Sequence, residues 1–309
     1  MKLNELALKS MTDIPEELKR LEIPGRVSFQ EGNGELPKLA IQTEWSAAEI
    51  YLHGAHVTDF RKNDEPPLLF TSQFSRFEAG QAIRGGVPII LPWFGAREGE
   101  PMHGFARTSN WVLHETAAFP DGGVSLRFAL PATPESAMWP RFTANYIVTV
   151  TDSLSLKLVI TNASPSDELT FENCLHTYFH VGDVSEISIH GLKAVHYLDK
   201  VDGFAPKTES SDSIRVKSEV DRIYLDTAND TEIRDPKLRR TIHIRKSGSS
   251  STVVWNPWIK KSQQMPDFGS DEYLRMVCVE SGNVSSNRIV LPPGLSSSLS
   301  VEISSEALG

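Results

Sequence analysis

Hydrophobic and polar residues alternate with a period of two along much of the chain. The clearest segment is 154–161, where four aliphatic residues from Leu154 to Ile160 share one face and mostly polar residues occupy the other. Residues 146–151 precede it across a two-residue Asp-Ser turn, so the two segments are predicted to form a β-hairpin.

Similar short runs, rich in Val, Ile, Thr and aromatic residues, recur between turn residues after residue 24. Further strands are predicted at 47–60, 124–130, 168–181, 186–190, 194–199, 241–246, 252–256, 274–280 and 298–304. The spacing leaves no room for βαβ units, so the pattern favours an all-β fold, a large antiparallel β-sandwich. Residues 247–251, a Ser-Gly-Ser-Ser-Ser run, are expected to be the tip of a hairpin.

The N-terminal residues have a different pattern. Around residues 13–21 an Asp N-cap candidate is followed by early acids and late bases, as the helix dipole prefers. We therefore predict a helical extension over 1–24 and a single β-sandwich domain over 25–309.

A short apolar run at 83–95 is bracketed by Gly and Pro and is predicted to be a buried strand or tight turn. Arg84 stands at its start, before a Gly-Gly pair that would let the backbone approach a ligand. Residues 103–107 repeat the combination of a cation, a small residue and an aromatic, ending at Arg107. Two such arginines suit an anionic group such as phosphate. The alternative is that both are ordinary arginines in surface loops.

Composition limits the possible partners. The 309 residues carry a net charge of -9, which argues against non-specific binding of nucleic acid. No apolar run approaches the length of a membrane span and the N-terminus has no signal-peptide core, so a soluble protein is expected. Only Cys174 and Cys278 are present, which favours buried free thiols in the reducing cytoplasm.

Titratable side chains lie on one face of the predicted strand 169–180. Leu169, Phe171, Leu175 and Phe179 form its core face, whereas Glu172, Cys174, His176, Tyr178 and His180 form the other. That second face could be simply solvated, or His176 could be a general acid. A metal site using His176 and His180 is disfavoured, because they lie about 13 Å apart along an extended strand.

Glu280 ends a hydrophobic strand and precedes a glycine turn. A carboxyl group there can be partly desolvated, which raises its pKa and makes it a better base near neutral pH. The alternative is a strand-end glutamate that reaches water. The sequence alone does not place Glu280 beside His176.

Two further motifs contain residues that could bind or position a ligand. Gly54-Ala55-His56 is expected to be a structural bend. Trp255 and Trp258, in a Trp-Asn-Pro-Trp motif, could stack on sugar rings, although at least one is expected to be a core residue.

Five motifs occur in the order and spacing of the glucose-6-phosphate 1-epimerases of the aldose 1-epimerase superfamily, which this chain resembles over residues 25–305. They are Ala-Ile-Arg-Gly-Gly-Val-Pro at 82–88, His-Gly-Phe-Ala-Arg at 103–107, Leu-His-Thr-Tyr-Phe at 175–179, Val-Asp-Arg-Ile-Tyr at 220–224 and Cys-Val-Glu at 278–280. The resemblance implies a supersandwich like that of galactose mutarotase, with neither metal nor organic cofactor, and a monomer that binds a small sugar phosphate.

The resemblance also implies the roles of individual residues. His176 would be the general acid and Glu280 the general base of ring opening and reclosure at C1. Arg84 and Arg107 would hold the sugar phosphate, His103 would lie in the same pocket, and Asp221 would bind sugar hydroxyls, with Asp199 in a similar setting. Met102 departs from the family pattern, which often has Gln before the His-Gly pair. An epimerase for unphosphorylated sugars and a non-catalytic sugar-binding sandwich are the competing hypotheses.

Overall fold

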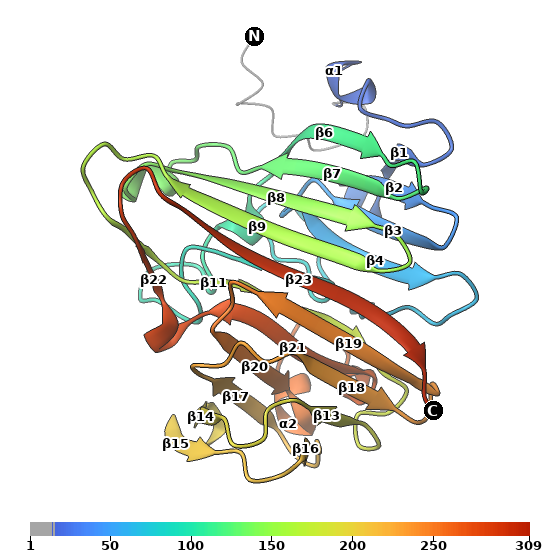
Figure 1. The fold of residues 1–309 in the computed structure, drawn as a ribbon, viewed down its shortest axis with the longest axis vertical. Coiled ribbons are helices and arrows are strands. Elements are labelled where there is room, and N and C mark those ends of the chain that lie inside the picture. Colours follow the sequence, from blue (N-terminus) through green and yellow to red (C-terminus); the bar gives the residue numbers. More distant parts are fainter. Residues whose placement is uncertain (1–13, 15) are drawn as a thin grey trace.

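The computed structural model describes residues 14 and 16–309, and its strands form three main antiparallel sheets. A nine-stranded sheet crosses the front of Figure 1 from top to bottom. In spatial order its strands are β6 (Val112–Ala118), β7 (Val124–Ala129), β8 (Phe142–Val150), β9 (Leu154–Asn162), β23 (Ser296–Ala307), β19 (Arg240–Ser247), β18 (Thr231–Asp235), β13 (Ser188–His190) and β16 (Ser213–Ile214).

An eight-stranded sheet packs behind the lower part of the nine-stranded sheet. In order it contains β15 (Ala205–Thr208), β14 (His196–Asp199), β17 (Val220–Tyr224), β20 (Ser251–Asn256), β21 (Met276–Asn283), β11 (Asn173–Leu175) and β5 (Ile89–Ile90), with β12 (Tyr178–His180) also paired to β21. Alternate residues of its central strands, such as Val254, Val277 and Val279, join the main core between the sheets.

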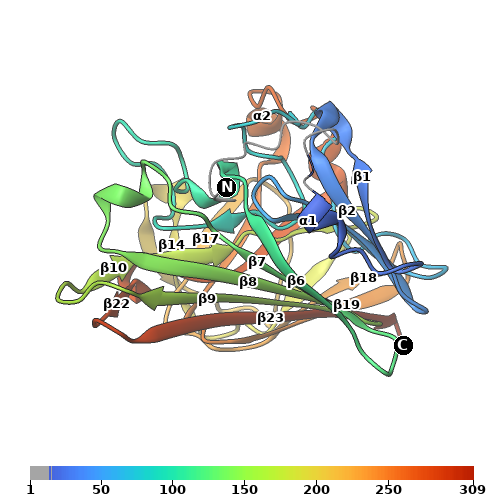
Figure 2. The ribbon, with the colours of Figure 1, turned by 90° about the horizontal axis from the view of Figure 1, so that it is seen from above.

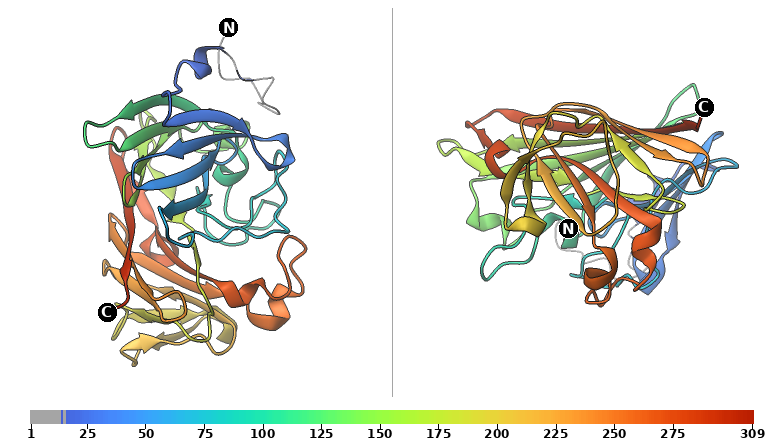
Figure 3. Two further views of the ribbon diagram at one scale, coloured as in Figure 1. Left: turned by 90° about the vertical axis from the view of Figure 1, so that its right-hand side faces the viewer. Right: turned by 90° about the horizontal axis from the view of Figure 1, so that it is seen from below.

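A four-stranded sheet covers the upper part of the same core. It contains β1 (Val27–Glu31), β2 (Pro37–Gln42), β3 (Ser46–Tyr51) and β4 (His56–Lys62), and a small pair joins β10 (Leu169–Phe171) to β22 (Ile289–Leu291). Seen edge-on, this blue sheet lies across the core from the red strand β23 (left panel of Figure 3). From above, β8, β9 and β23 run side by side as one layer (Figure 2).

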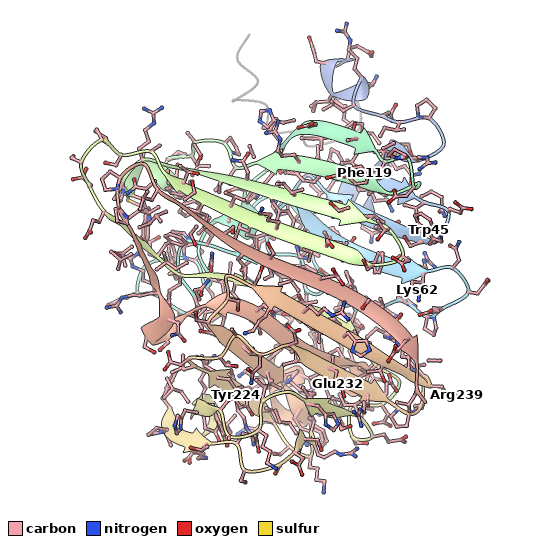
Figure 4. The ribbon with its side chains drawn as sticks, viewed as in Figure 1. Trp45, Lys62, Phe119, Tyr224, Glu232 and Arg239 are labelled. Atoms are coloured by element: carbon pink, nitrogen blue, oxygen red, sulfur yellow. The ribbon has the colours of Figure 1, made fainter. Side chains whose placement is uncertain are left out.

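Side chains fill the space between these layers. Trp45 and Phe119 mark the upper end of the molecule in Figure 4, and Tyr224 marks the lower part. The side chain of Tyr224 is fully buried in the main core, which therefore extends into the lower part of the sandwich. Leu154, Leu156, Leu158 and Ile160 all lie in this core, as the alternating pattern predicts.

The predicted β-sandwich and the 146–161 hairpin are confirmed, with β8 paired to β9 from Phe142 opposite Asn162 to Val150 opposite Leu154. The predicted strand 47–60 is instead a hairpin of β3 and β4. Gly54 and Ala55, both at positive φ, turn the chain between them, which confirms the predicted bend. His56 follows this bend and is fully buried, with Nε2 2.7 Å from the Gly85 carbonyl oxygen.

Two other predictions were wrong in detail. Residues 247–251 are not a hairpin tip, because β19 belongs to the nine-stranded sheet and β20 to the eight-stranded sheet, so this segment crosses between layers. The glycines at 85 and 86 admit the protein's own backbone, not a ligand: an added Cβ would lie 2.4 Å from the Phe70 oxygen and 2.2 Å from the Val57 oxygen, respectively.

The helices are short. Residues 1–13 and 15 of the predicted N-terminal helix lie outside the described residues. Of the rest, only α1 (Glu16–Lys19) is α-helical; for residues 20–24 the prediction was wrong, because the chain turns there and Ile23 bridges to Val27. The division at residue 24 stays a prediction. α2 (Trp258–Ser262) was not predicted. No helix in the described part of the chain is long and apolar enough to cross a membrane.

Candidate active site

The predicted strand 169–180 is broken into β10, β11 and β12, but its pairing with β21 keeps one register across the second break. Cys174 lies opposite Gly282 and Tyr178 opposite Cys278, so each pair of numbers sums to 456. His176, between β11 and β12, therefore falls opposite Glu280 (456 − 176 = 280). Antiparallel pairing is thus what brings together two residues that are 104 positions apart in the sequence.

The two side chains meet in a buried setting. His176 Nε2 lies 3.2 Å from Glu280 Oε1, and only 9% and 1% of the respective side chains are exposed. The hypotheses of a solvated strand face and of a strand-end glutamate in water are therefore wrong. Burial lowers the pKa of His176 well below its usual range, and burial raises the pKa of Glu280 well above its usual range.

Both cysteines flank Glu280 as free, buried thiols, as predicted. The thiol of Cys174 donates to Glu280 Oε2 at 3.5 Å, and Cys278 lies on the same face of β21 as Glu280. Because Cys174 is opposite Gly282, four residues beyond Cys278, the two Cα atoms are about 13 Å apart along the strand. A disulfide between them is excluded, since bridged Cα atoms lie within about 7 Å.

Arg84 approaches the site from the segment before β5. Its Nη2 and Nε lie 3.1 and 3.2 Å from Asp267 Oδ2, and its Nη1 donates to the hydroxyl of Tyr178 at 3.1 Å. The ring of Tyr178 stacks on that of His176, with centroids 4.8 Å apart and planes 12° apart. Arg84 is thus held rigidly beside the catalytic histidine candidate, with its charge partly balanced by Asp267.

Arg107 lies in the 3₁₀ turn Ala106–Thr108 and has a different environment. Its Nη2 donates to the carbonyl oxygen of Met102 at 2.8 Å, whereas its Nε is buried without a hydrogen-bond partner among the described residues. No carboxylate of the described chain forms an ion pair with it. Burial lowers the pKa of Arg107 to about 10, so it remains a cation at neutral pH. The side chain of Met102 is 53% exposed, and its backbone is what holds Arg107.

His103 stands between Arg107 and His176. Its Nδ1 accepts a hydrogen bond from the Gly95 amide at 3.0 Å, and its ring packs edge-on against His176 with centroids 5.6 Å apart. Burial lowers the pKa of His103 well below its usual range, so the ring is neutral with its proton on Nε2. It can donate one hydrogen bond into the site.

Strand register shows which of the two candidate aspartates, Asp221 and Asp199, faces the site. Asp221 pairs with Trp255 and Trp255 with Cys278, so these three share the face that carries Glu280. Asp199 pairs with Arg222, the next residue along β17, and therefore points to the opposite face. Asp221 lies in the site, paired with Lys200 at 2.9 Å, while Asp199 caps the turn Lys200–Asp202.

Aromatic residues close the site around the polar groups. Trp255 packs edge-on against both His176 and Tyr178, at centroid distances of 6.1 and 5.9 Å. Phe94 packs against His103 and lies 5.7 Å from Lys200 Nζ. Trp258, in contrast, packs partly buried against the main core, which confirms that one tryptophan of this motif is a core residue.

A separate cavity of about 1100 Å³ does not contain this site. It lies between the outer face of β3 and β4 and residues 70–78, and its lining mixes acids such as Glu49 and Asp59 with bases such as Arg275. His180 lines this other cavity. His176 and His180 therefore lie in different places, in agreement with the prediction that they do not bind one metal ion together.

Comparisons with known proteins identify the family. The aldose 1-epimerase family profile matches residues 37–304. The chain belongs to the aldose 1-epimerase family. It is 36% identical over 256 residues to a Cenchrus ciliaris protein named "Putative glucose-6-phosphate 1-epimerase", covering 80% of this chain and 78% of that one. An Escherichia coli protein of the same name is 35% identical, with 83% and 86% covered.

Solved structures of similar proteins share the fold. The crystal structure of a "putative mutarotase" from Salmonella typhimurium superposes with a TM-score of 0.85 at 29% identity, covering 94% of this chain and 99% of that one. A galactose 1-epimerase from Lactobacillus acidophilus, at 11% identity, has a TM-score of 0.67, with 91% and 99% covered, and shows the fold alone. The fold expected for this epimerase family is therefore confirmed.

All six predicted site residues of this epimerase lie in one region of the eight-stranded sheet and the segments beside it. The predictions missed Tyr178 as a partner of Arg84, although it lies on the titratable face that the sequence shows. They also missed Lys200 and Asp267. Lys200 adjoins the considered Asp199, whereas Asp267 lies in an irregular segment after α2 that has no recognisable motif.

Proposed function

We propose that this protein interconverts the α and β anomers of a hexose 6-phosphate, with glucose 6-phosphate as its main substrate. Arg107 is the observation that carries the phosphate part of the proposal, because it is a cation at the site with no carboxylate partner in the described chain. An anionic group of the ligand would supply that partner. The curated relatives with 35–36% identity carry names with the same substrate.

The order of groups across the site fits the order of atoms in the sugar. Asp221 and Lys200 are the charges that act most strongly on Glu280, whereas Arg107 and Arg84 are the cations that act on His176. In a pyranose 6-phosphate, the C1 hydroxyl lies on one side of the ring oxygen and C6 lies on the other. Placing C1 at Glu280 and the ring oxygen at His176 directs the phosphate towards the arginines and the other hydroxyls towards Asp221.

The acid–base pair can open and close the ring. Glu280, as a carboxylate, takes the proton of the C1 hydroxyl while His176, as an imidazolium, gives a proton to the ring oxygen, and the bond between C1 and that oxygen breaks. Rotation about C1–C2 and reclosure with the proton transfers reversed give the other anomer. Each positioned proton transfer contributes about 10²–10⁴-fold in rate.

The phosphate would also prepare the pair for this reaction. Within the protein alone, burial, His103 and the two arginines oppose the imidazolium form of His176. A bound phosphate dianion offsets the charge of these arginines and thereby raises the pKa of His176 in the complex. The two buried free thiols fit a protein of the reducing cytoplasm, which we include in the proposal.

The test is anomer exchange, measured by NMR saturation transfer for glucose 6-phosphate and for glucose. The protein should accelerate exchange of the phosphorylated sugar well above that of glucose. Arg107→Ala should raise KM for glucose 6-phosphate about 10–100-fold, as expected for a lost charge-assisted contact, and leave the glucose reaction nearly unchanged.

Arg97→Ala is a matched control, because Arg97 is an exposed arginine on the loop before His103 whose side chain packs on Trp93 and Trp139 by cation–π contact. It should change neither reaction. Equal losses on both sugars in Arg107→Ala would count against a phosphate site. Binding of the sugar phosphate without any acceleration of exchange would support the non-catalytic alternative.

A further inference from the structure

A third titratable group adjoins the acid–base pair and has no role in the proposed reaction. The nitrogen of His176, the sulfur of Cys278 and a carboxylate oxygen of Glu280 all lie within 4.8 Å of one another, and all three residues are buried. Proton transfer needs only the histidine and the glutamate. Cys278 Sγ forms no hydrogen bond with any described residue.

We propose that these three residues form an inhibitory site for a thiophilic divalent cation such as Zn²⁺. Thiolate, imidazole and carboxylate are the three ligand types that Zn²⁺ takes in proteins. His176 would bind through Nε2 as a neutral imidazole, and a water molecule would occupy the fourth position towards the pocket. The site does not depend on the proposed reaction, because its binding can be measured without turnover.

The geometry is close to what such an ion needs. Ligands at zinc–ligand distances of about 2.0–2.3 Å in a tetrahedron lie roughly 3.3–3.8 Å apart. His176 Nε2 and Glu280 Oε1 are already 3.2 Å apart. Cys278 Sγ lies within 4.8 Å of the other two ligand atoms. A rotation of the Cys278 side chain that brings Sγ about 1 Å closer would give all three ligands the separations of a tetrahedral site.

The charges also balance. The Cys278 thiol releases one proton on binding, and the His176–Glu280 pair releases the proton that it holds in its reactive form. A thiolate and a carboxylate then together neutralise a divalent cation. In the free protein burial raises the pKa of Cys278, which keeps the thiol protonated until a metal displaces the proton. Because the ion holds the lone pairs of both His176 and Glu280, it excludes the acid–base reaction and competes with the sugar.

Co²⁺ is the probe, because a thiolate ligand gives it a charge-transfer absorption band. Titration of the full-length protein at the pH of maximal activity should produce this band with one equivalent bound and about two protons released, and Zn²⁺ should displace the cobalt. Glucose 6-phosphate should weaken cobalt binding. Cys278→Ser should abolish the band and weaken Zn²⁺ inhibition of anomer exchange at least 10-fold.

Cys174→Ser is the matched control, because Cys174 contacts Glu280 from the other side and is not one of the three ligands. It should retain the band whatever its rate of anomer exchange. Should the serine variant at 278 fail to fold, Cys278→Ala tests the same loss without a buried hydroxyl. Surface groups, such as His243 between Glu232 and Glu306, would bind cobalt without a thiolate band.

The proposal is overturned by any of three results: no thiolate band at saturating Co²⁺, a band that persists in both Cys278 variants, or a band lost in Cys174→Ser and kept in Cys278→Ser. A protein that binds cobalt with the expected band but does not accelerate anomer exchange would retain the metal site and refute the proposed reaction. The two proposals therefore fail separately.

Discussion

Val277 and Val279 point from β21 into the main core, whereas their neighbours Cys278 and Glu280 point into the candidate active site. Both faces are equally buried, since none of these four side chains exposes more than 1% of its surface. They differ in what burial does. On the core face, burial of apolar carbon stabilises the fold, while on the site face it opposes the charged forms on which the chemistry depends. Burial alone therefore does not locate this site. The alternation of side chains between the two faces of β21 does, because the even-numbered residues 278 and 280 share the site face.

The largest expected effect comes from Glu280→Gln on the site face. The rate of anomer exchange should fall at least 10²–10⁴-fold, because the base is lost and the shape is kept. A residual rate within 10-fold of the wild type would remove Glu280 from the proposed mechanism. The measurement is NMR saturation transfer at saturating glucose 6-phosphate.

The same substitution should stabilise the fold at neutral pH. The pKa of Glu280 is raised in the folded state above the usual 4.5, so the wild type loses stability as pH rises from 4.5 through the folded pKa. Glu280→Gln lacks this loss. Its melting temperature should exceed that of the wild type by a few degrees at pH 7–8, and the difference should vanish below pH 4.5. Calorimetry across this range measures both limits.

Val279→Ala, on the core face, should destabilise the fold and leave the reaction nearly unchanged. Removing two buried methyl groups should lower the free energy of unfolding by about 2 kcal/mol, including the cavity left behind. KM for glucose 6-phosphate should remain within about 2-fold, because the inner face touches no site group. Urea unfolding and kinetics on the same sample check this, and a large change in KM would mean that the two faces are not independent.

A smaller effect is expected in the pH profile. The one-proton form of the His176–Glu280 pair is the reactive form, so the profile should be bell-shaped, with limbs that belong to the pair. A bound phosphate dianion favours protonation, so both limbs should lie at higher pH in kcat than in kcat/KM. Glucose, which lacks the dianion, serves as the control and should show no such displacement.

The smallest expected effect is that of Cys174→Ala. The thiol stabilises the ionised form of Glu280 by donating to Oε2, so its removal should raise the pKa of the pair and move the acid limb of kcat/KM upward by less than one pH unit. The rate at the optimum should change less than 10-fold. A profile superimposable on that of the wild type would show that the contact has no influence on Glu280.

Much of the fold could be predicted from the sequence because period-two patterns report which face is buried. The β8–β9 hairpin follows from the alternation around Leu154–Ile160 and a two-residue turn. The break after Leu175 could not be predicted. The Thr177 amide there bonds back to the Leu175 carbonyl, while the amides of His176 and Tyr178 continue the pairing with the distant segment 86–88. The crossover at 247–251 depends likewise on which sheets its two strands join.

The residues of the candidate site could be named from the sequence, but their geometry could not. Each motif around Arg84, Arg107, His176 and Glu280 is local, and resemblance supplied the link between them. The pairing of Arg84 with Asp267 spans 183 residues and uses an irregular segment. Arg107 has no such carboxylate partner among the residues that the structure describes. No local pattern encodes these contacts.

The place of β23 in the nine-stranded sheet has a consequence for how the protein is made. This strand, Ser296–Ala307, leaves the ribosome after the other strands of its sheet, and it lies between β9 and β19 in the middle of the sheet. Until it emerges, both neighbours have an open hydrogen-bonding edge that could pair with another nascent chain. A chain truncated before Ser296 would keep both edges, so termination ahead of this strand should produce aggregates in place of a shortened enzyme.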